Sequence, residues 1–167
     1  KEWRFTHDAT HGVRVNHYIK PRDKIRSPMG GDVKRTVADI EEEPSGGIAF
    51  SLIFDVARAH RKVAVAEDDW GLQACTTKEA PPVDSQDDEE EVKVNTVCTY
   101  GVGSAAYWWS RIGGAAIRML HYIIGRWASF WLLFYADDGM LTAKGRNFYE
   151  VLIAAMALLT VFGFPLK

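Results

Sequence analysis

The chain has 167 residues, of which 47% are hydrophobic, so it can bury one substantial core and falls within the usual size of a single domain. Its formal net charge of −2 excludes a strongly basic protein, in which clustered lysine and arginine would mark a polyanionic partner. Six of its 22 acids lie between positions 84 and 91, and without them 20 bases face 16 acids, a balance of about +4. The rest of the chain is therefore mildly basic, which is compatible with a polyanionic partner without demanding one.

The N-terminal residues and the cysteine content indicate an intracellular setting. The sequence begins at Lys1 and has no charged-then-apolar leader, so we expect no secretory signal and a piece excised from a longer chain. Cys75 and Cys98 have no metal-ligand spacing and are too few for a disulfide scaffold. We therefore expect a protein of the cytoplasm or nucleus that is not secreted, with both cysteines as small apolar residues of strands.

Two apolar stretches, 112–134 and 151–164, raise the alternative of a membrane hairpin. The first is interrupted by Arg118, His121 and Arg126, and the second is shorter than the roughly 20 residues that a membrane-spanning helix needs. Buried helices explain both stretches better. We therefore expect no membrane partner.

In chain order, residues 1–20 are expected to form irregular strand and loop, and the first clear helix follows them. Asp32 is expected to cap a helix over 33–43, which the sequence Pro-Ser-Gly-Gly then ends. Next comes a continuous β-prone run, 48–54, which delivers Asp55 at its end. One acid is thus expected at the exit of a buried strand.

The middle of the chain is expected to alternate short strands with a polar insertion. Short strands are predicted at 63–65 and 72–76, and alternating residues predict a half-buried strand over 92–98. Between them, the acidic stretch 79–91 contains Pro-Pro and is most simply a solvated loop. Its charge indicates no specific role.

The last third of the chain predicts a helix, a hairpin and a second helix. Residues 105–124 have the small and aromatic content of a helix, and 146–162 are apolar nearly all round, as in a buried helix. Between them, the apolar run 130–134 leads to Asp138-Gly139, the strongest short hairpin signal. This order of elements predicts an α+β fold, in which helices pack on one face of an antiparallel sheet.

Three carboxylates are expected at the ends of two strands. Asp55 precedes the pair Asp137-Asp138 by 82 residues, and pairing of their strands would bring the three acids together. Like charges only a few ångströms apart repel unless a cation offsets them. Hard oxygen ligands of this kind suit Mg²⁺ or Mn²⁺ rather than Zn²⁺.

Two motifs around these acids resemble those of reverse transcriptases. The tetrapeptide 135–138, Tyr-Ala-Asp-Asp, resembles the aromatic-x-Asp-Asp signature of the family. Segment 54–60, Phe-Asp-Val-Ala-Arg-Ala-His, resembles the upstream motif, in which an aspartate (here Asp55) is followed five residues later by a bulky side chain (here His60). Both motifs occur in the order that the family requires.

Two further segments extend the resemblance, one between these two motifs and one near the N-terminus. Segment 100–109, Tyr-Gly-Val-Gly-Ser-Ala-Ala-Tyr-Trp-Trp, is similar to the family's template-and-nucleotide motif, except that Ala106 replaces its usual proline. Segment 3–8, Trp-Arg-Phe-Thr-His-Asp, with Asn16 beyond it, resembles the fingers segment in which an arginine, here Arg4, meets the incoming triphosphate. The resemblance therefore covers nearly the whole chain.

The resemblance implies part of the fingers and most of the palm of a retroelement reverse transcriptase. Residues 1–47 would be the partial fingers and 48–167 the palm, with the acidic loop 79–91 inserted and the chain ending before the thumb. The implied reaction is transfer of a nucleotidyl group from a deoxynucleoside triphosphate to a primer 3′-hydroxyl, directed by an RNA or DNA template. Two Mg²⁺ or Mn²⁺ ions would assist it.

The resemblance also implies roles for individual residues. Asp55 and Asp137 would bridge the two ions, Asp138 would support them, and the carbonyl of Val56 would add an oxygen ligand. His60 would form a sugar gate against the ribose 2′-hydroxyl, although an ordinary packed histidine is the alternative. The remaining implied positions are Arg4, Arg58, Ala59 and Gly101 for nucleotide binding, with Tyr135 and Ala136 supporting the motif.

Several alternatives stay open. A viral RNA-dependent RNA polymerase shares the palm, but its signature usually has glycine where this chain has Ala136. A catalytically silent, nucleic-acid-binding remnant of a mobile element is a further alternative, against which the intact acids argue. The sequence also leaves open the class of retroelement, the oligomeric state and whether this piece is active without a thumb.

Two other side-chain patterns have simpler explanations than a site. The pair His7 and His11 has a spacing that zinc sites use but lacks further ligands. Tryptophans are more often part of a core than platforms for stacked bases. We therefore expect four of them to be core residues: Trp108, Trp109, Trp127 and Trp131.

Overall fold

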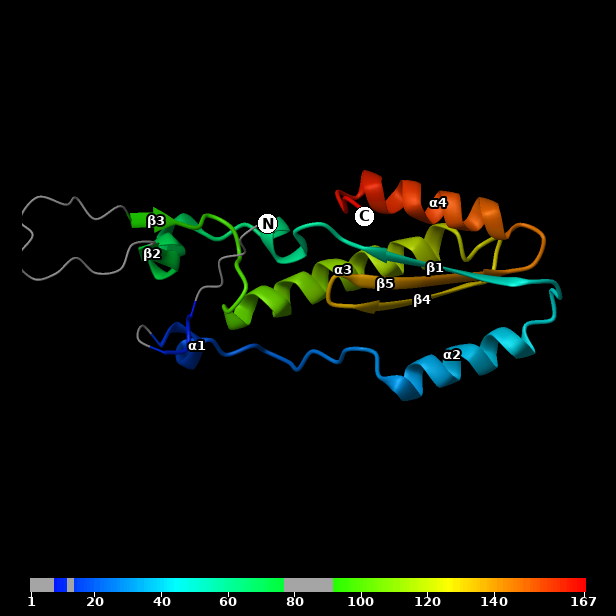
Figure 1. Cartoon of the computed structure of the whole chain (residues 1–167), viewed down its shortest axis with the longest axis horizontal. Helices are drawn as coiled ribbons and strands as arrows, with labels where there is room; N and C mark the ends of the chain where they lie inside the picture. The colour runs from blue at the N-terminus through cyan, green and yellow to red at the C-terminus, as the bar shows by residue number, and fades with distance from the viewer. Residues whose placement is uncertain (1–7, 12–13, 77–91) are drawn as a thin grey trace, which may run out of the picture. The chain divides into compact units, whose positions relative to one another are not determined.

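The computed structural model describes residues 8–11, 14–76 and 92–167, which form two compact units (Figure 1). The first unit contains the described residues within Lys1–Arg22 and His60–Trp108, and the second consists of Asp23–Ala59 and Trp109–Lys167. Helices and antiparallel strands occur together, so the α+β class is confirmed. Arg4, His7 and the acidic loop 79–91 lie outside the described residues.

The first unit is built around a small antiparallel ladder. Strand β2 (Ala74–Thr76) pairs with β3 (Val92–Val94), and Ala64 forms an isolated bridge with Val97 in place of the strand expected at 63–65. β2 is shorter than predicted because Glu67–Gln73 forms a 3-10 helix with three acids in its first turn, where the helix dipole favours negative charge. The unit also contains helix α1 (Val15–Tyr18), most of the 3-10 helix Ala59–Lys62, and the start of α3 (Gly103–Ile123).

The core of the first unit contains polar groups that bond to one another. The side-chain oxygen of Gln73 accepts a 3.3 Å hydrogen bond from the Thr99 hydroxyl, and both residues are buried.

Cys98 is buried, and its N–H donates to the carbonyl of Val63 at 2.9 Å. Cys75 lies in β2. Both cysteines therefore behave as the small apolar residues that the sequence predicted, although Cys98 follows the strands instead of lying in one.

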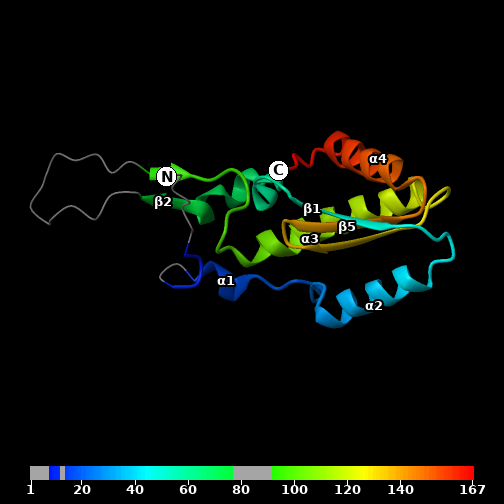
Figure 2. The same cartoon turned by 45° about the vertical axis from the view of Figure 1, so that its right-hand side comes forward.

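The second unit contains a three-stranded antiparallel sheet with the order β1-β5-β4. β1 (Ala49–Asp55) pairs with β5 (Asp138–Lys144), and β5 pairs with β4 (Phe130–Tyr135). In both views the strands run between helices α4 (Phe148–Val161) and α2 (Gly30–Glu42) (Figures 1 and 2). The pairing of the two acid-bearing strands is the one on which the expected carboxylate cluster depends.

One face of this sheet is covered. Residues opposite one another in an antiparallel ladder point to the same face, so Phe54, Gly139 and Phe134 share a face. The ring of Phe134 lies 6.2 Å from that of Trp109 on α3. On the same face, the ring of Phe148 on α4 stacks on that of Phe50 on β1 at a distance of 5.6 Å. Helices α3 and α4 therefore pack on this covered face, as predicted.

The other face carries the acids, and we call it the acid-bearing face. It contains Ser51, Ile53 and Asp55 of β1 and their partners on β5, Thr142, Met140 and Asp138. Ile53 is 76% exposed, although the sequence predicted a continuous buried strand. The prediction was wrong for β1 because this strand lies at the edge of the sheet and only one of its faces is covered.

Helix α2 meets the far end of the acid-bearing face. The ammonium of Lys144 donates to the carbonyls of Ile40 at 2.7 Å and Glu43 at 3.1 Å, which satisfies carbonyls at the C-terminal end of α2. At the other end, Asp32 lies inside the first turn of α2 rather than at the cap. Its carboxylate accepts the N–H of Met29 at 2.8 Å, so the helix begins earlier than predicted.

Helix α4 is only half-buried. Val151, Ala155 and Leu159 are buried, whereas Tyr149 and Ile153 are largely exposed. The prediction of a helix buried all round was therefore wrong, because α4 is packed by the sheet on one side only. Among the described residues, no helix combines the length and the apolar content that crossing a membrane requires.

Candidate functional site

The β4–β5 turn, which carries the paired acids, falls earlier than predicted. Ala136 and Asp137 form the two-residue turn, and Ala136 has a positive φ of 53°. Asp138 and Gly139 are already part of β5. The sequence had placed the turn at Asp138-Gly139.

Gly139 is needed for packing, which explains the shift of the turn. A Cβ built on Gly139 would overlap the ring of Phe54, which lies directly opposite it on β1. Both residues are buried. The glycine therefore serves close packing between two strands, and the strained turn conformation falls on Ala136, a residue that adopts it reluctantly.

Asp55 and Asp138 face each other across β1 and β5. Both main-chain groups of Asp55 bond on the opposite side, where its C=O accepts the N–H of Lys167 at 2.9 Å and its N–H donates to the Lys167 carbonyl at 3.4 Å. The Asp55–Asp138 pair is therefore of the non-hydrogen-bonded kind, in which the Cα atoms approach to about 4.5 Å and the side chains lie closest. Two carboxylates thus share one face at the end of the sheet.

Asp137 is fixed mainly through its backbone. Its carbonyl accepts the N–H of Val56 at 2.8 Å, which continues the ladder one step beyond the end of β1. The Val56 side chain is buried, so only its main chain can reach a ligand. Within the described parts of the chain, no three His, Cys, Asp or Glu side chains converge closely enough to hold a metal ion. The strand pairing thus sets Asp138, rather than Asp137, directly opposite Asp55.

A cationic side chain lies beside this pair. Residues 165–167 run antiparallel to the end of β1, where Val56 bridges Leu166 and the N–H of Ala57 donates to the carbonyl of Pro165 at 2.8 Å. The Lys167 ammonium lies 3.8 Å from the Asp55 carboxylate, and both groups are partly exposed. Such an exposed pair contributes little to stability, but it supplies a nearby positive charge.

Trp109 binds the backbone of the β4–β5 turn through its side chain. Its indole N–H donates to the carbonyl of Ala136 at 2.7 Å, and its side chain is only 1% exposed. The Trp109 ring packs 5.3 Å from that of Phe164 and 6.2 Å from that of Phe134. The prediction of a core tryptophan is confirmed here, but it is wrong for Trp108 and Trp127, which are 51% and 50% exposed.

The expected nucleotide-binding residues are divided between the two units. In the second unit, Arg58 is exposed and has a positive φ of 56°, and Ala59 after it is fully buried. In the first unit, the His60 ring lies 4.9 Å from that of Tyr100, with the planes tilted by 56°. His60 therefore packs against an aromatic neighbour, which either of its two sequence interpretations allows.

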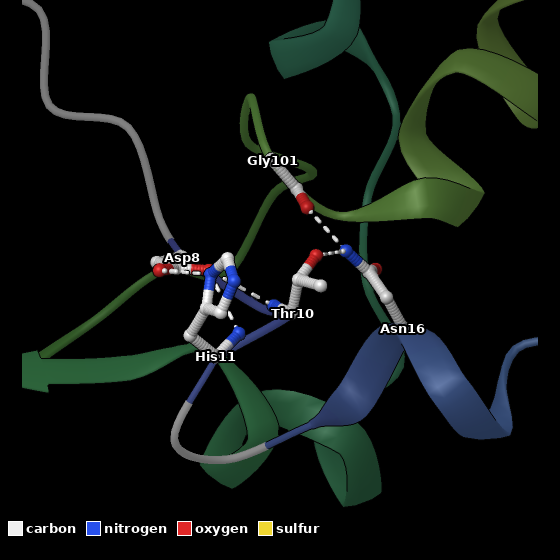
Figure 3. A network of polar contacts seen from close by, with 5 residues as sticks. All are labelled: Asp8, Thr10, His11, Asn16 and Gly101. Atoms are coloured by element: carbon white, nitrogen blue, oxygen red, sulfur yellow. Dashed lines mark hydrogen bonds and ion pairs between the residues drawn. The ribbon is translucent and has the colours of Figure 1, made fainter.

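Gly101 is held in a conformation that other residues rarely adopt. Its φ is +94°, which L-residues reach only under strain. Its carbonyl accepts a 2.7 Å hydrogen bond from the side-chain amide of Asn16 (Figure 3).

His11, considered for a zinc site, instead pairs its ring Nδ1 with the Asp8 carboxylate at 3.0 Å.

Comparison with known proteins adds no family to this geometry. No protein-family model matches the sequence, and no curated protein matches it. The resemblance to reverse transcriptases therefore depends on the motifs in the sequence, two of which meet in the second unit where β1 pairs with β5.

Three residues near the acids were missed by reasoning from the sequence: Trp109 as the anchor of the turn, Lys167 as the neighbouring cation, and Gly139 as a packing residue. The signal for Trp109 was its place at the aromatic position of segment 100–109, but a single sequence does not reveal which carbonyl an indole N–H meets. Lys167 gave no signal, because only the return of the chain along β1 brings it to Asp55.

Proposed function

We propose that this chain is the palm, with part of the fingers, of an RNA-directed DNA polymerase from a retrotransposon-like element. It would transfer a nucleotidyl group from a deoxynucleoside triphosphate to the 3′-hydroxyl of a primer paired with an RNA or DNA template. One observation carries the proposal. Two motifs separated by 82 residues, each reverse-transcriptase-like, meet through strand pairing, which sets Asp55 opposite Asp138.

The donor chemistry of this pair fits a hard divalent cation. Carboxylate oxygens are the ligands that Mg²⁺ and Mn²⁺ prefer, and two negative charges on neighbouring strands favour a positive partner. Asp55 and Asp138 would hold such an ion, and Asp137, which does not form a closed group with them in this structure, would join them with the Val56 carbonyl when the ion binds. When bound, the ions would supply charge that activates the attacking hydroxyl and stabilises the leaving pyrophosphate.

The protein's own groups would orient the substrates. Main-chain N–H groups at Arg58 and Ala59 are candidates for the triphosphate oxygens, and the left-handed backbone at Arg58 is typical of anion-binding turns. His60 would select against a ribose 2′-hydroxyl, and Gly101 would let the backbone approach the new base pair without a Cβ. Arg4 belongs to the same proposal as a phosphate ligand.

A primer-extension assay with the full chain, an RNA template and Mg²⁺ tests the function. Asp55→Asn and Asp138→Asn should each lower the rate by about a hundredfold or more, because each removes charge that the transferring phosphoryl group depends on. Asp39→Asn, which removes one exposed carboxylate from α2, is the matched control and should keep the wild-type rate.

The same variants give a second measurement that needs no turnover. Binding of Mn²⁺, followed by its electron paramagnetic resonance signal, should weaken in Asp55→Asn and Asp138→Asn and stay unchanged in Asp39→Asn. Extension by none of the proteins, or by all of them equally, would contradict the polymerase proposal. Efficient use of ribonucleotides in place of deoxynucleotides would instead favour an RNA polymerase.

A further inference from the structure

Asn16 ties two distant parts of the first unit together. Its side-chain NH₂ donates to the carbonyl of Gly101 at 2.7 Å and to the hydroxyl of Thr10 at 2.9 Å, and its side-chain oxygen accepts the N–H of Gly103 at 2.7 Å. Its own backbone N–H donates to the carbonyl of Ala9 at 2.9 Å. Figure 3 shows the amide between the 8–11 segment and the Gly101 loop. Both side-chain hydrogens and the oxygen are thus in use.

The bond to Gly103 replaces a helix cap that the local sequence does not provide. Gly103 is the first residue of α3, and the first N–H groups of a helix need an acceptor from outside it. The preceding residue, Val102, has no side-chain oxygen and is buried. Asn16 supplies the acceptor from 87 residues away. The start of α3 and the Gly101 carbonyl are therefore set by one side chain.

The partners of Asn16 are themselves ordered. The Asp8 carboxylate accepts the N–H groups of Thr10 and His11, each at 3.0 Å, and these bonds lower the pKa of Asp8, the bond from His11 contributing most. The Thr10 hydroxyl in turn receives the Asn16 amide. The Asn16 side chain is thus fixed by Thr10 while it bonds to the Gly101 loop.

We propose that Asn16 is a positioning residue for the Gly101 loop, which it holds ready to receive the incoming deoxynucleoside triphosphate. The proposal rests on the proposed function, in which Gly101 lies against the new base pair. Gly101 has φ +94°, and glycine in such a loop has many other conformations available. One hydrogen bond that the planar Asn16 amide donates to Gly101 and one that it accepts from Gly103 remove that freedom before the nucleotide binds, which lowers the entropy loss that binding must offset.

The variant Asn16→Asp tests this role most sharply. A carboxylate keeps the acceptor for the Gly103 N–H but loses both donors and turns an oxygen toward the Gly101 carbonyl. We expect the KM for the deoxynucleotide to rise roughly tenfold, the effect of losing about one net hydrogen bond, while kcat changes much less. Asn16→Ala should have a larger effect. His17→Ala, which removes the adjacent exposed side chain of α1, is the control and should leave KM unchanged.

Hydrogen–deuterium exchange of the Gly101–Gly103 amides provides a measurement independent of turnover. The Gly103 amide should exchange faster in Asn16→Ala, which removes its acceptor, and the Val102 amide should exchange faster in both Asn16 variants, whereas neither should change in His17→Ala. If the wild type extends primers but both Asn16 variants keep its KM, the positioning role is overturned while the polymerase stands. If the wild type extends nothing, the proposed function fails and the nucleotide-positioning role fails with it. Unchanged exchange in both Asn16 variants would also overturn the role.

Discussion

Replacing Trp109 by phenylalanine removes the bond that supports the turn carrying the paired acids. Phenylalanine keeps an aromatic ring against Phe164 and Phe134 but has no N–H for the carbonyl of Ala136, which lies 2.7 Å from the indole nitrogen. A carbonyl left without a donor in a partly buried place costs about 1–3 kcal/mol. The smaller ring also leaves unfilled volume, since Trp109 is fully enclosed, and this adds up to about 1 kcal/mol.

We therefore expect Trp109→Phe to lower the free energy of unfolding by about 1–4 kcal/mol. Urea denaturation followed by far-ultraviolet circular dichroism measures this loss without relying on tryptophan fluorescence. Trp127→Phe is the matched control, because Trp127 is half exposed and should change stability by less than about 0.5 kcal/mol. Equal losses in the two variants would refute the assignment of Trp109 as an anchor.

A substitution by benzothienylalanine separates the hydrogen bond from the volume. This residue replaces the indole N–H by sulfur and keeps the shape of the ring system, so it tests the bond to Ala136 alone. We expect this substitution to lower the free energy of unfolding by about 1–3 kcal/mol, the contribution of the lost hydrogen bond alone. Wild-type stability with benzothienylalanine at position 109 would show that the ring, and not its N–H, fixes the turn.

Three other predictions follow from single contacts. Gly139→Ala should destabilise the protein by about 1–3 kcal/mol in denaturation, because its Cβ would overlap the Phe54 ring, whereas Gly30→Ala at the exposed start of α2 should not. His60→Ala should raise ribonucleotide incorporation in primer extension, and unchanged sugar discrimination would contradict a gate at this position. The ring of His121 is exposed but stacks on that of Phe130 at 4.4 Å, and the partial loss of solvent there lowers its pKa. The unfolded chain therefore binds the proton first, and stability should fall slightly as the pH drops below about 6.5. His121→Gln should reduce that slope, and an identical slope would argue against the effect.

The order of the main helices and strands could be predicted from sequence because local patterns determine it. The β-prone run before Asp55, the apolar run of β4 and the small and aromatic residues of α3 each carry their own signal. Pairing of the strands that carry Asp55 and Asp138 was expected as well, and the register confirms it. The carboxylate pair thus follows from two local patterns and one pairing.

What could not be predicted depends on contacts between residues far apart in the chain. Asp-Gly is a strong local turn signal, but Gly139 is used for the Phe54 ring, which is 85 positions earlier in the sequence. Tertiary packing therefore outweighed turn propensity and moved the turn to Ala136. The same holds for Asn16, whose hydrogen-bond partners Gly101 and Gly103 lie 85 and 87 residues away. No periodicity encodes such pairs.

The acids and their supports differ in the kind of interaction that holds them, and this makes the chemistry separable from the scaffold. Asp55 is fixed by main-chain bonds to Lys167 on one side and by the register with β5 on the other, and the turn before Asp138 is fixed by Trp109 and by Val56. None of these bonds uses a carboxylate. Aspartate-to-asparagine changes at the pair should thus remove charge while the backbone stays in place, whereas changes at Trp109 or Gly139 should displace the backbone while every charge remains. The aspartate variants should lose cation binding and keep normal stability, whereas the Trp109 and Gly139 variants should lose stability although they keep every carboxylate. This pattern distinguishes a catalytic pair from two acids that only share a strand end.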